Sequence, residues 1–424
     1  MMSAVNPQGW TSPRQFLLLW SLCACLVVNE VLEMPRHFQQ YLRVPQSQEI
    51  DLSDLEAQFH TKRLQVLQRL KETDLLEWGA YEDFKHYVDN FQVYVLNKTA
   101  DPSPPLSMLT NYTYFYLPDK GGANLCWAAT LFHTYYQQPS PSPLPHILIT
   151  SLNRDWGAFS VSMLPGVYIM KSKYEQNLQY KKKSCLDSNG TDILGLYLNH
   201  PDTKAVISTQ AHDVHYEKAH SLALGLEAPV RSYLIYETLK RQQPRQTRPD
   251  IMYVSAKEWD FRQGALKLVE ERFHVSNQYQ QYWGFDANNP QAFRKTRLQR
   301  VRQSIRELFT SIPNPPKQYY LNMSHSKFVF SPVGFGMDCY RNWEALYLGS
   351  IPIIETRNRT QDNWFRVFDD LPVALIDHFD NLTPEWLEAE YVRILGGNYR
   401  WEKLTKQYWV DFTKAFLDPT QRQL

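Results

Sequence analysis

The sequence predicts an α/β protein with two doubly wound, Rossmann-like domains that face each other across a cleft. Short apolar runs typical of buried parallel strands alternate with segments of helical periodicity along most of the chain. A polar, basic segment interrupted by prolines, from Lys240 to Pro249, separates this alternation into two halves. The chain of 424 residues is long enough for two domains, and it shows no repeat of the kind that builds solenoids or propellers.

The composition is that of a folded protein without a strongly charged surface. Aromatic residues make up 14% of the chain, with 12 Trp and 26 Tyr, which is too apolar for disorder. The formal net charge is +1, so bulk electrostatics give no reason to expect nucleic acid as a partner.

Residues 1–29 are predicted to direct the chain into the secretory pathway. Arg14 precedes the apolar run FLLLWSLCACLVV, Phe16 to Val28, which fits a signal-peptide core and is shorter than the ~20 residues that span a bilayer. Asn-x-Ser/Thr sequons follow at Asn97, Asn111, Asn189, Asn322, Asn358 and Asn381. We therefore expect a luminal protein that is glycosylated at some of these positions.

The next segments are a stem with a helical extension (30–105) and an N-terminal α/β domain (106–244). In the stem, Phe91 to Leu96 alternates as a strand does. The domain should contain a helix, Asn124 to Tyr136, buried strands at His146–Thr150 and Lys204–Ser208, and a Leu-rich strand before Gly225. Polar groups follow two of these strands, at the edge where parallel sheets hold their sites: Asp155, then His212, Asp213 and His215. Each of these is also compatible with a structural or solvated role.

Residues 245–424 are predicted to form a C-terminal α/β domain. A strand, Asp250 to Ser255, opens it, and Lys257 stands just past that strand, where it could reach a phosphate. We interpret the basic face of an amphipathic helix at Phe293–Phe309, and the charges of the Lys240–Pro249 linker, as solvated surface rather than a glycan site. The remaining predicted elements are a buried strand within Phe368–Asp377, a helix starting at Thr383-Pro384, and a closing helix from Trp401 to Phe416.

The most informative stretch is Ser326 to Glu355, SKFVFSPVGFGMDCYRNWEALYLGSIPIIE. It predicts a strand to Ser331, a glycine turn, an N-cap at Asp338, a helix from Cys339 to Leu348, a helix end at Gly349, and a second strand. Residue spacing places Arg341 and Glu344 on one face of the helix and Trp343, Leu346 and Tyr347 on a packing face.

This unit has the chemistry of a nucleotide-sugar site. The positive helix N-terminus and Arg341 suit a diphosphate, and the Glu344 carboxylate can accept hydrogen bonds from two sugar hydroxyls. An ordinary βαβ unit with a tight turn is the alternative, because short glycine motifs often occur without a ligand.

The stretch resembles the signature of exostosin-type (GT47-type) glycosyltransferases, S-K-F-x-x-x-P-x-G-x-G-x-D-x-x-R-x-x-E-A-x-x-x-G-x-I-P. Weaker resemblance covers LNRDWG and HxxAHSLALGL in the first half. The resemblance implies a GT-B fold, in which the N-terminal domain binds the acceptor and the C-terminal domain binds the nucleotide-sugar. It also implies a type II Golgi membrane topology, in which residues 1–29 stay as a signal anchor; a cleaved, secreted form is the alternative.

The implied reaction is inverting transfer of a sugar from a nucleotide-sugar to a glycan or glycoprotein acceptor, with no cofactor besides that co-substrate. The base would come from Asp155, His212, Asp213 or His215, across the cleft from the donor. Donor binding would use these residues: Ser331, Gly334, Gly336, Arg341, Glu344 and Lys257.

Absent motifs narrow the alternatives. The sequence has no His-Glu-x-x-His, paired Cys-x-x-Cys, P-loop, Gly-x-Ser-x-Gly or Asp-x-Asp, so we expect a metal-independent enzyme.

Cys126 and Cys185 are expected to form a disulfide, with two free thiols as the alternative. Another group transfer on this scaffold, or an inactive glycan-binding protein, are the rival functions, and nucleotide binding separates the latter from a transferase.

Overall fold

A computed structural model gives the structure of the protein. It describes residues 51–76, 93–96, 106–117, 123–150, 189–209, 217–226, 229–246, 248–256, 260–279, 315–333, 338–356 and 363–417. The chain divides into two units, Met1–Leu52 and Ser53–Leu424, and both sheets belong to the second unit.

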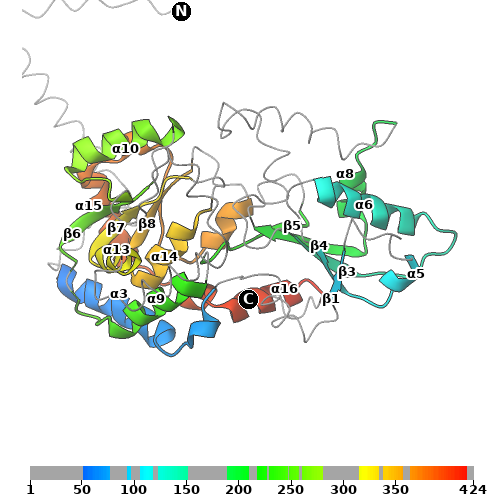
Figure 1. Cartoon of the computed structure of the whole chain (residues 1–424), viewed down its shortest axis with the longest axis horizontal. Helices are drawn as coiled ribbons and strands as arrows, with labels where there is room; N and C mark the ends of the chain where they lie inside the picture. The colour runs from blue at the N-terminus through cyan, green and yellow to red at the C-terminus, as the bar shows by residue number, and fades with distance from the viewer. Residues whose placement is uncertain are drawn as a thin grey trace, which may run out of the picture. The chain divides into compact units, whose positions relative to one another are not determined.

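The first sheet is parallel throughout and its strands pair in chain order. Its strands are β1 (Val93–Val95), β2 (Tyr114–Leu117), β3 (His146–Thr150), β4 (Thr203–Thr209) and β5 (Ala219–Leu222). The described helices that accompany them are α5 (Leu106–Leu109), α6 (Ala123–Tyr136) and α8 (Ile193–Asn199). Phe115, Leu148 and Val206 are partners in the strand register, so their side chains point to the same face and share a core with residues of α6 and α8. Figure 1 shows these two helices beside the sheet.

The second sheet is also parallel and pairs in chain order. Its strands are β6 (Asp250–Val254), β7 (Ser326–Phe330), β8 (Ile351–Glu355) and β9 (Ala374–Ile376). The described helices of this half are α3 (Leu52–Leu67), α9 (Pro229–Arg241), α10 (Asp260–Phe273), α13 (Pro315–Ser324), α14 (Tyr340–Leu348) and α15 (Pro384–Leu395). The helix α16 (Lys406–Lys414) contacts η5, and its Phe412 lies against His220 of β5 in the first sheet. The 3₁₀ turns are η1 (Glu72–Asp74), η3 (Asn363–Phe368), η4 (Phe379–Asn381) and η5 (Trp401–Leu404).

The predicted α/β class is confirmed, with one parallel sheet in each half. Strands expected at Phe91–Leu96, His146–Thr150, Lys204–Ser208 and Asp250–Ser255 are β1, β3, β4 and β6. Among the described strands, neither sheet shows the reversal of strand order that marks a doubly wound sheet. Parallel strands are buried on both faces, which explains why their continuous apolar runs were easy to find.

The closing helix expected from Trp401 to Phe416 is instead two elements. The turn η5 ends at Leu404, and α16 starts after Thr405, whose side-chain oxygen accepts a hydrogen bond from the Tyr408 N–H. Thr405 is therefore the N-cap of α16. Its backbone is extended, as an N-cap requires, and one continuous helix cannot pass through a residue in that conformation.

The Lys240–Pro249 segment is not simply a solvated linker. α9 continues to Arg241, and Arg248 is 5% exposed. Its guanidinium donates to the carbonyl oxygens of Ser326 and Leu348, to the Ser350 hydroxyl and to His60 Nε2. A basic side chain among prolines looks like surface in the sequence because its partners lie 78 to 188 residues away.

Several predictions fall outside the described residues: the Phe16–Val28 run and the Phe293–Phe309 helix. Cys126 is disulfide-bonded, although its partner is also outside them, and Cys339 is a free thiol. Within the described ranges no helix is long and apolar enough to cross a membrane.

Candidate functional site

The candidate site lies where β7 ends and α14 begins. β7 runs to Phe330, Ser331 follows it, and α14 starts at Tyr340. Gly349 ends the helix with a left-handed backbone (φ 79°), and β8 follows, as the sequence predicts. The order of strand, helix and strand is thus confirmed, whereas the predicted glycine turn with Gly334 and Gly336 lies outside the described residues.

Asp338 does not cap the helix as expected. The N-cap is Cys339, which makes no side-chain cap hydrogen bond. Asp338, 2% exposed, instead accepts hydrogen bonds from the Trp343 indole (2.9 and 3.0 Å), the Asn342 amide (3.0 Å) and the Leu224 backbone N–H (2.9 Å). Burial raises the pKa of this carboxyl to about 6, although the hydrogen bonds from Leu224, Trp343 and Asn342 favour its charged form.

Ser331 connects the end of β7 to the first turn of α14. Its hydroxyl donates to Asn342 Oδ1 at 2.5 Å and lies 3.1 Å from Cys339 Sγ. The side chain is 2% exposed, so in this arrangement it positions the helix start rather than facing an open cavity.

Arg341 is a cation at this site whose guanidinium has N–H groups that do not donate a hydrogen bond within the described structure. It is partly buried, and its Nε and Nη1 atoms are enclosed without a hydrogen-bond partner among the described residues. Burial lowers its pKa, but Tyr319, Cys339 and Glu344 nearby outweigh burial and raise the pKa overall. Enclosed N–H groups without an acceptor are costly, so this guanidinium is suited to an anion that enters the site.

Glu344 is more enclosed than its predicted role implies. It is 1% exposed, and its two oxygens accept from the Tyr319 hydroxyl (2.8 Å), the Tyr320 hydroxyl (3.2 Å) and Arg231 Nη1 (3.2 Å). Its ion-pair partner in the described structure is Arg231 of α9, while Arg341 lies beyond ion-pair distance.

The expected division of α14 into a ligand face and a packing face is also incorrect. Every residue from Asn342 to Leu348 is buried, because α9 and α13, β8 and η5 all contact the helix. Trp343 is fully buried, as predicted, and stacks on Phe368 with ring centroids 5.5 Å apart.

Residues that the sequence prediction missed lie on neighbouring elements. Ser255 directly follows β6, and because Val254 pairs with Phe330, Ser255 stands beside Ser331 at the same edge of the sheet. Its hydroxyl is buried without a hydrogen-bond partner among the described residues. Strand-end position, the signal that selected Lys257, could also have found Ser255; nothing local marks Arg231, Tyr319 or Tyr320 as partners of Glu344.

The other candidate residues lie outside the described residues: Lys257, Asp155, His212, Asp213 and His215. In the ranges that the structure describes, no group of three or more His, Cys, Asp or Glu side chains is arranged to hold a metal ion.

Fold and site together describe an α/β protein with an anion-suited helix start at the carboxyl edge of a parallel sheet. Residues 290–380 match the family model of the RXYLT1 C-terminal domain, a glycosyltransferase family. The matched segment includes α13, β7, α14, β8, η3 and β9, and therefore Ser331, Arg341 and Glu344, whereas Arg231 and Ser255 lie before it. The match supports a glycosyltransferase in general and not the exostosin type specifically. No curated protein matches the chain in a sequence comparison.

Proposed function

We propose that the protein is a glycosyltransferase that moves a sugar from a nucleotide-sugar to a glycan or glycoprotein acceptor. The observation that carries the proposal is the coincidence of two independent features on residues 326–355. The glycosyltransferase family match covers this unit, and the unit contains a partly buried arginine with two unbonded N–H groups.

The donor diphosphate would bind at the start of α14. Arg341 would supply charge-assisted hydrogen bonds from Nε and Nη1, and the helix N-terminus would add its positive end. The Ser255 hydroxyl, buried at the same sheet edge, is available as a further donor to the ligand. Positive charge placed here stabilises the departing diphosphate, which is the electrostatic requirement of sugar transfer.

The finer features of the proposal come from sequence resemblance. They are a GT-B arrangement, inversion at the anomeric carbon, no need for a divalent metal, donor contacts from Gly334, Gly336 and Lys257, and a base among Asp155, His212, Asp213 and His215. Glu344 would hold the ribose hydroxyls only after exchanging a contact to Tyr319, Tyr320 or Arg231, because each of its oxygens is already bonded.

A location in the secretory lumen, in the Golgi membrane or secreted, is part of the same proposal. Asn111, Asn189 and Asn381 are exposed and accessible to glycosylation, whereas the Asn322 side chain is hydrogen-bonded to Gln318 and Gln278. Expressed in a eukaryotic secretory host, the chain should shift in gel mobility after glycosidase treatment.

The direct test is a thermal-shift panel of nucleoside diphosphates and nucleotide-sugars with the full chain. A ligand that binds only the folded state at a hundred times its Kd adds roughly 2.7 kcal/mol of stability, which a melting curve detects readily. At least one nucleoside diphosphate should raise Tm, also in the presence of a chelator. Absence of any shift across the panel would exclude a nucleotide-sugar-dependent transferase.

A further inference from the structure

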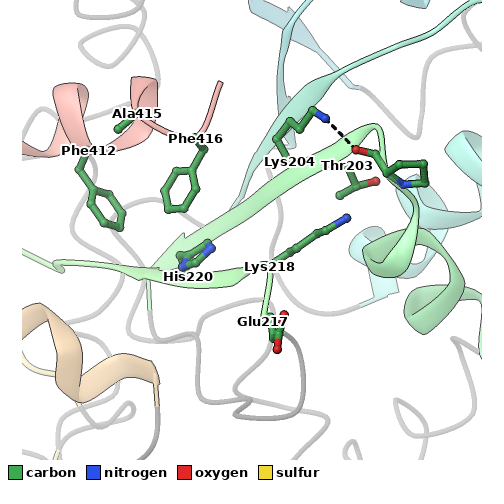
Figure 2. Close-up of a pocket in the computed structure, with 9 residues that line it drawn as sticks. Thr203, Lys204, Glu217, Lys218, His220, Phe412, Ala415 and Phe416 are labelled. Carbon is green, nitrogen blue, oxygen red and sulfur yellow. Dashed lines mark hydrogen bonds between the residues drawn. The ribbon is translucent and has the colours of Figure 1, made fainter. Parts of the chain in front are cut away.

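A cavity of about 500 Å³ lies beside the first sheet, at the amino ends of β4 and β5, whereas the candidate donor site belongs to the second sheet. Figure 2 shows its walls, which come from the starts of these strands and from the end of α16. The volume is within the usual range for a site that encloses a small organic ligand. Its lining residues belong to none of the elements that form the candidate donor site.

Two lysines supply positive charge to this cavity without a carboxylate partner. Lys204 Nζ donates to the Pro201 carbonyl at 2.8 Å (Figure 2). Lys218 Nζ donates to the His200 carbonyl at 2.6 Å. An ammonium has three N–H groups, so each lysine keeps two for a ligand. Neither makes an ion pair in the described structure, and the nearby Asp202 carboxylate accepts from the Leu144 N–H.

The two ammonium groups also repel each other. The pKa of Lys218 is lowered, first by burial and then by the charge of Lys204. An anion between these amines would relieve both effects, because it replaces lost solvation and compensates the repulsion.

The remaining wall is aromatic and carries one hydrogen-bond acceptor. His220 and Phe416 pack with ring centroids 4.2 Å apart, and Phe412 meets Phe416 edge-on at 5.1 Å. Glu217 also lines the cavity and is exposed, so its carboxylate can accept hydrogen bonds from hydroxyl groups. Cations, a flat apolar surface and a hydroxyl acceptor together match a ring with an apolar face, several hydroxyls and an acidic group.

We propose that this cavity binds an acidic sugar, a monosaccharide unit with a carboxylate or phosphate group held by Lys204 and Lys218. The ring would pack against Phe416 and its hydroxyls would donate to Glu217. The choice of a sugar rests on the proposed glycosyltransferase function. The cavity would then hold part of an acidic glycan away from the donor site.

The test is calorimetric titration of the full chain with glucose 6-phosphate, glucuronate, glucose and inorganic phosphate. At least one acidic sugar should bind at least about tenfold more tightly than glucose, and the preferred one tells phosphate from carboxylate recognition. Lys218→Gln and Lys204→Gln should each weaken that binding about tenfold. Lys267→Gln, which removes an exposed lysine on α10, should leave it unchanged.

Equal binding of glucose, unaltered binding in both lysine variants, or no binding at about 10 mM ligand would each overturn the proposal. Phosphate binding as tight as that of the sugar phosphate, and insensitive to Phe416→Ala, would mean a bare anion site and would overturn it too. Nucleoside diphosphate affinity is measured on the same variants and should not change. Acidic-sugar binding without nucleotide binding would refute the transferase while leaving this site in place.

Discussion

The two ends of α14 are built from opposite chemistry. At the carboxyl end, Arg63 donates to the Tyr347 carbonyl (2.5 Å) and Arg248 to the Leu348 carbonyl (2.8 Å), so buried cations satisfy the carbonyl groups that a helix leaves unpaired. At the amino end the capping residue makes no side-chain cap hydrogen bond, and Arg341 keeps two enclosed N–H groups without a partner among the described residues. At the carboxyl end, side chains of the protein satisfy the free carbonyl groups. At the amino end, N–H groups of Arg341 can still bind a ligand.

This contrast separates stability from binding. The arginines at the carboxyl end are buried and their neighbour Gly349 leaves no room, since a Cβ there would lie 2.5 Å from Arg63 Cζ. We expect substitution of the arginines at that end to change the free energy of unfolding, and substitution of Arg341 at the amino end to change ligand affinity with little effect on stability. Variants at both ends of the helix test this expectation.

Trp343→Ala should destabilise the protein most, by roughly 3–5 kcal/mol, because the ring is fully buried against Phe368 and donates to Asp338. Chemical denaturation measures the loss. Val392→Ala, at a position on α15 that is 41% exposed, is the control and should change stability by less than about 0.5 kcal/mol. A loss below about 1 kcal/mol for Trp343→Ala would show that the start of α14 is not held by packing.

Arg248→Ala should cost roughly 2–4 kcal/mol in the free energy of unfolding. The change leaves the Ser326 carbonyl without this donor and opens a cavity, and only part of the loss is offset by relief of repulsion with Arg63. Nucleotide affinity of the folded variant should stay within about twofold of the wild type. If nucleotide affinity falls while the free energy of unfolding is unchanged, the carboxyl end of α14 serves ligand binding rather than stability, contrary to the expectation.

Asp338 should give a pH-dependent loss of stability. Its pKa is about 6 in the folded protein against an ordinary value of 3.8, so between these values the folded state binds a proton that the unfolded state has lost. Stability therefore decreases as pH rises from about 4 through about 6, by roughly 2–3 kcal/mol, and this contribution becomes constant only well above pH 6.

The measurement is the difference in unfolding free energy between wild type and Asp338→Asn at several pH values. The variant should lack that decrease, whereas Asp380→Asn, at an exposed position in η4, should retain it. Parallel pH profiles for wild type and Asp338→Asn would show that the carboxyl is already ionised when buried.

Arg341→Ala should have the smallest effect on stability, within about 1 kcal/mol, and should weaken nucleoside diphosphate binding about tenfold or more. Two unbonded N–H groups are lost, so no internal hydrogen bond from Nε or Nη1 has to break. Glu344→Gln is the informative comparison, because its carboxylate is bonded to Tyr319, Tyr320 and Arg231 and its loss should lower Tm. Unchanged affinity in Arg341→Ala would place the donor site elsewhere.

Local sequence patterns correctly predicted the strands and the helix from β7 to β8. Contacts with residues distant in the sequence explain why the roles predicted for Asp338 and Glu344 were wrong or incomplete. Gly349 was found because a left-handed helix end favours glycine whatever surrounds it, and β7 and β8 were found because their apolar runs are continuous. Asp338 was misassigned because its partners include Leu224, which is 114 residues away. Glu344 has the spacing of a ligand residue, but Tyr319, Tyr320 and Arg231 surround it, and no local pattern connects these positions.

The contact between Arg63 and Tyr347 joins residues that are 284 positions apart, which matters while the chain is being synthesised. At roughly 5–20 residues per second, α3 leaves the ribosome about 15–60 seconds before its partner helix exists. During that interval Phe59, Leu64 and Leu67 lack the part of their hydrophobic core that α14 and the elements after it supply. α3 is therefore the segment of this protein that we expect a folding chaperone to hold the longest.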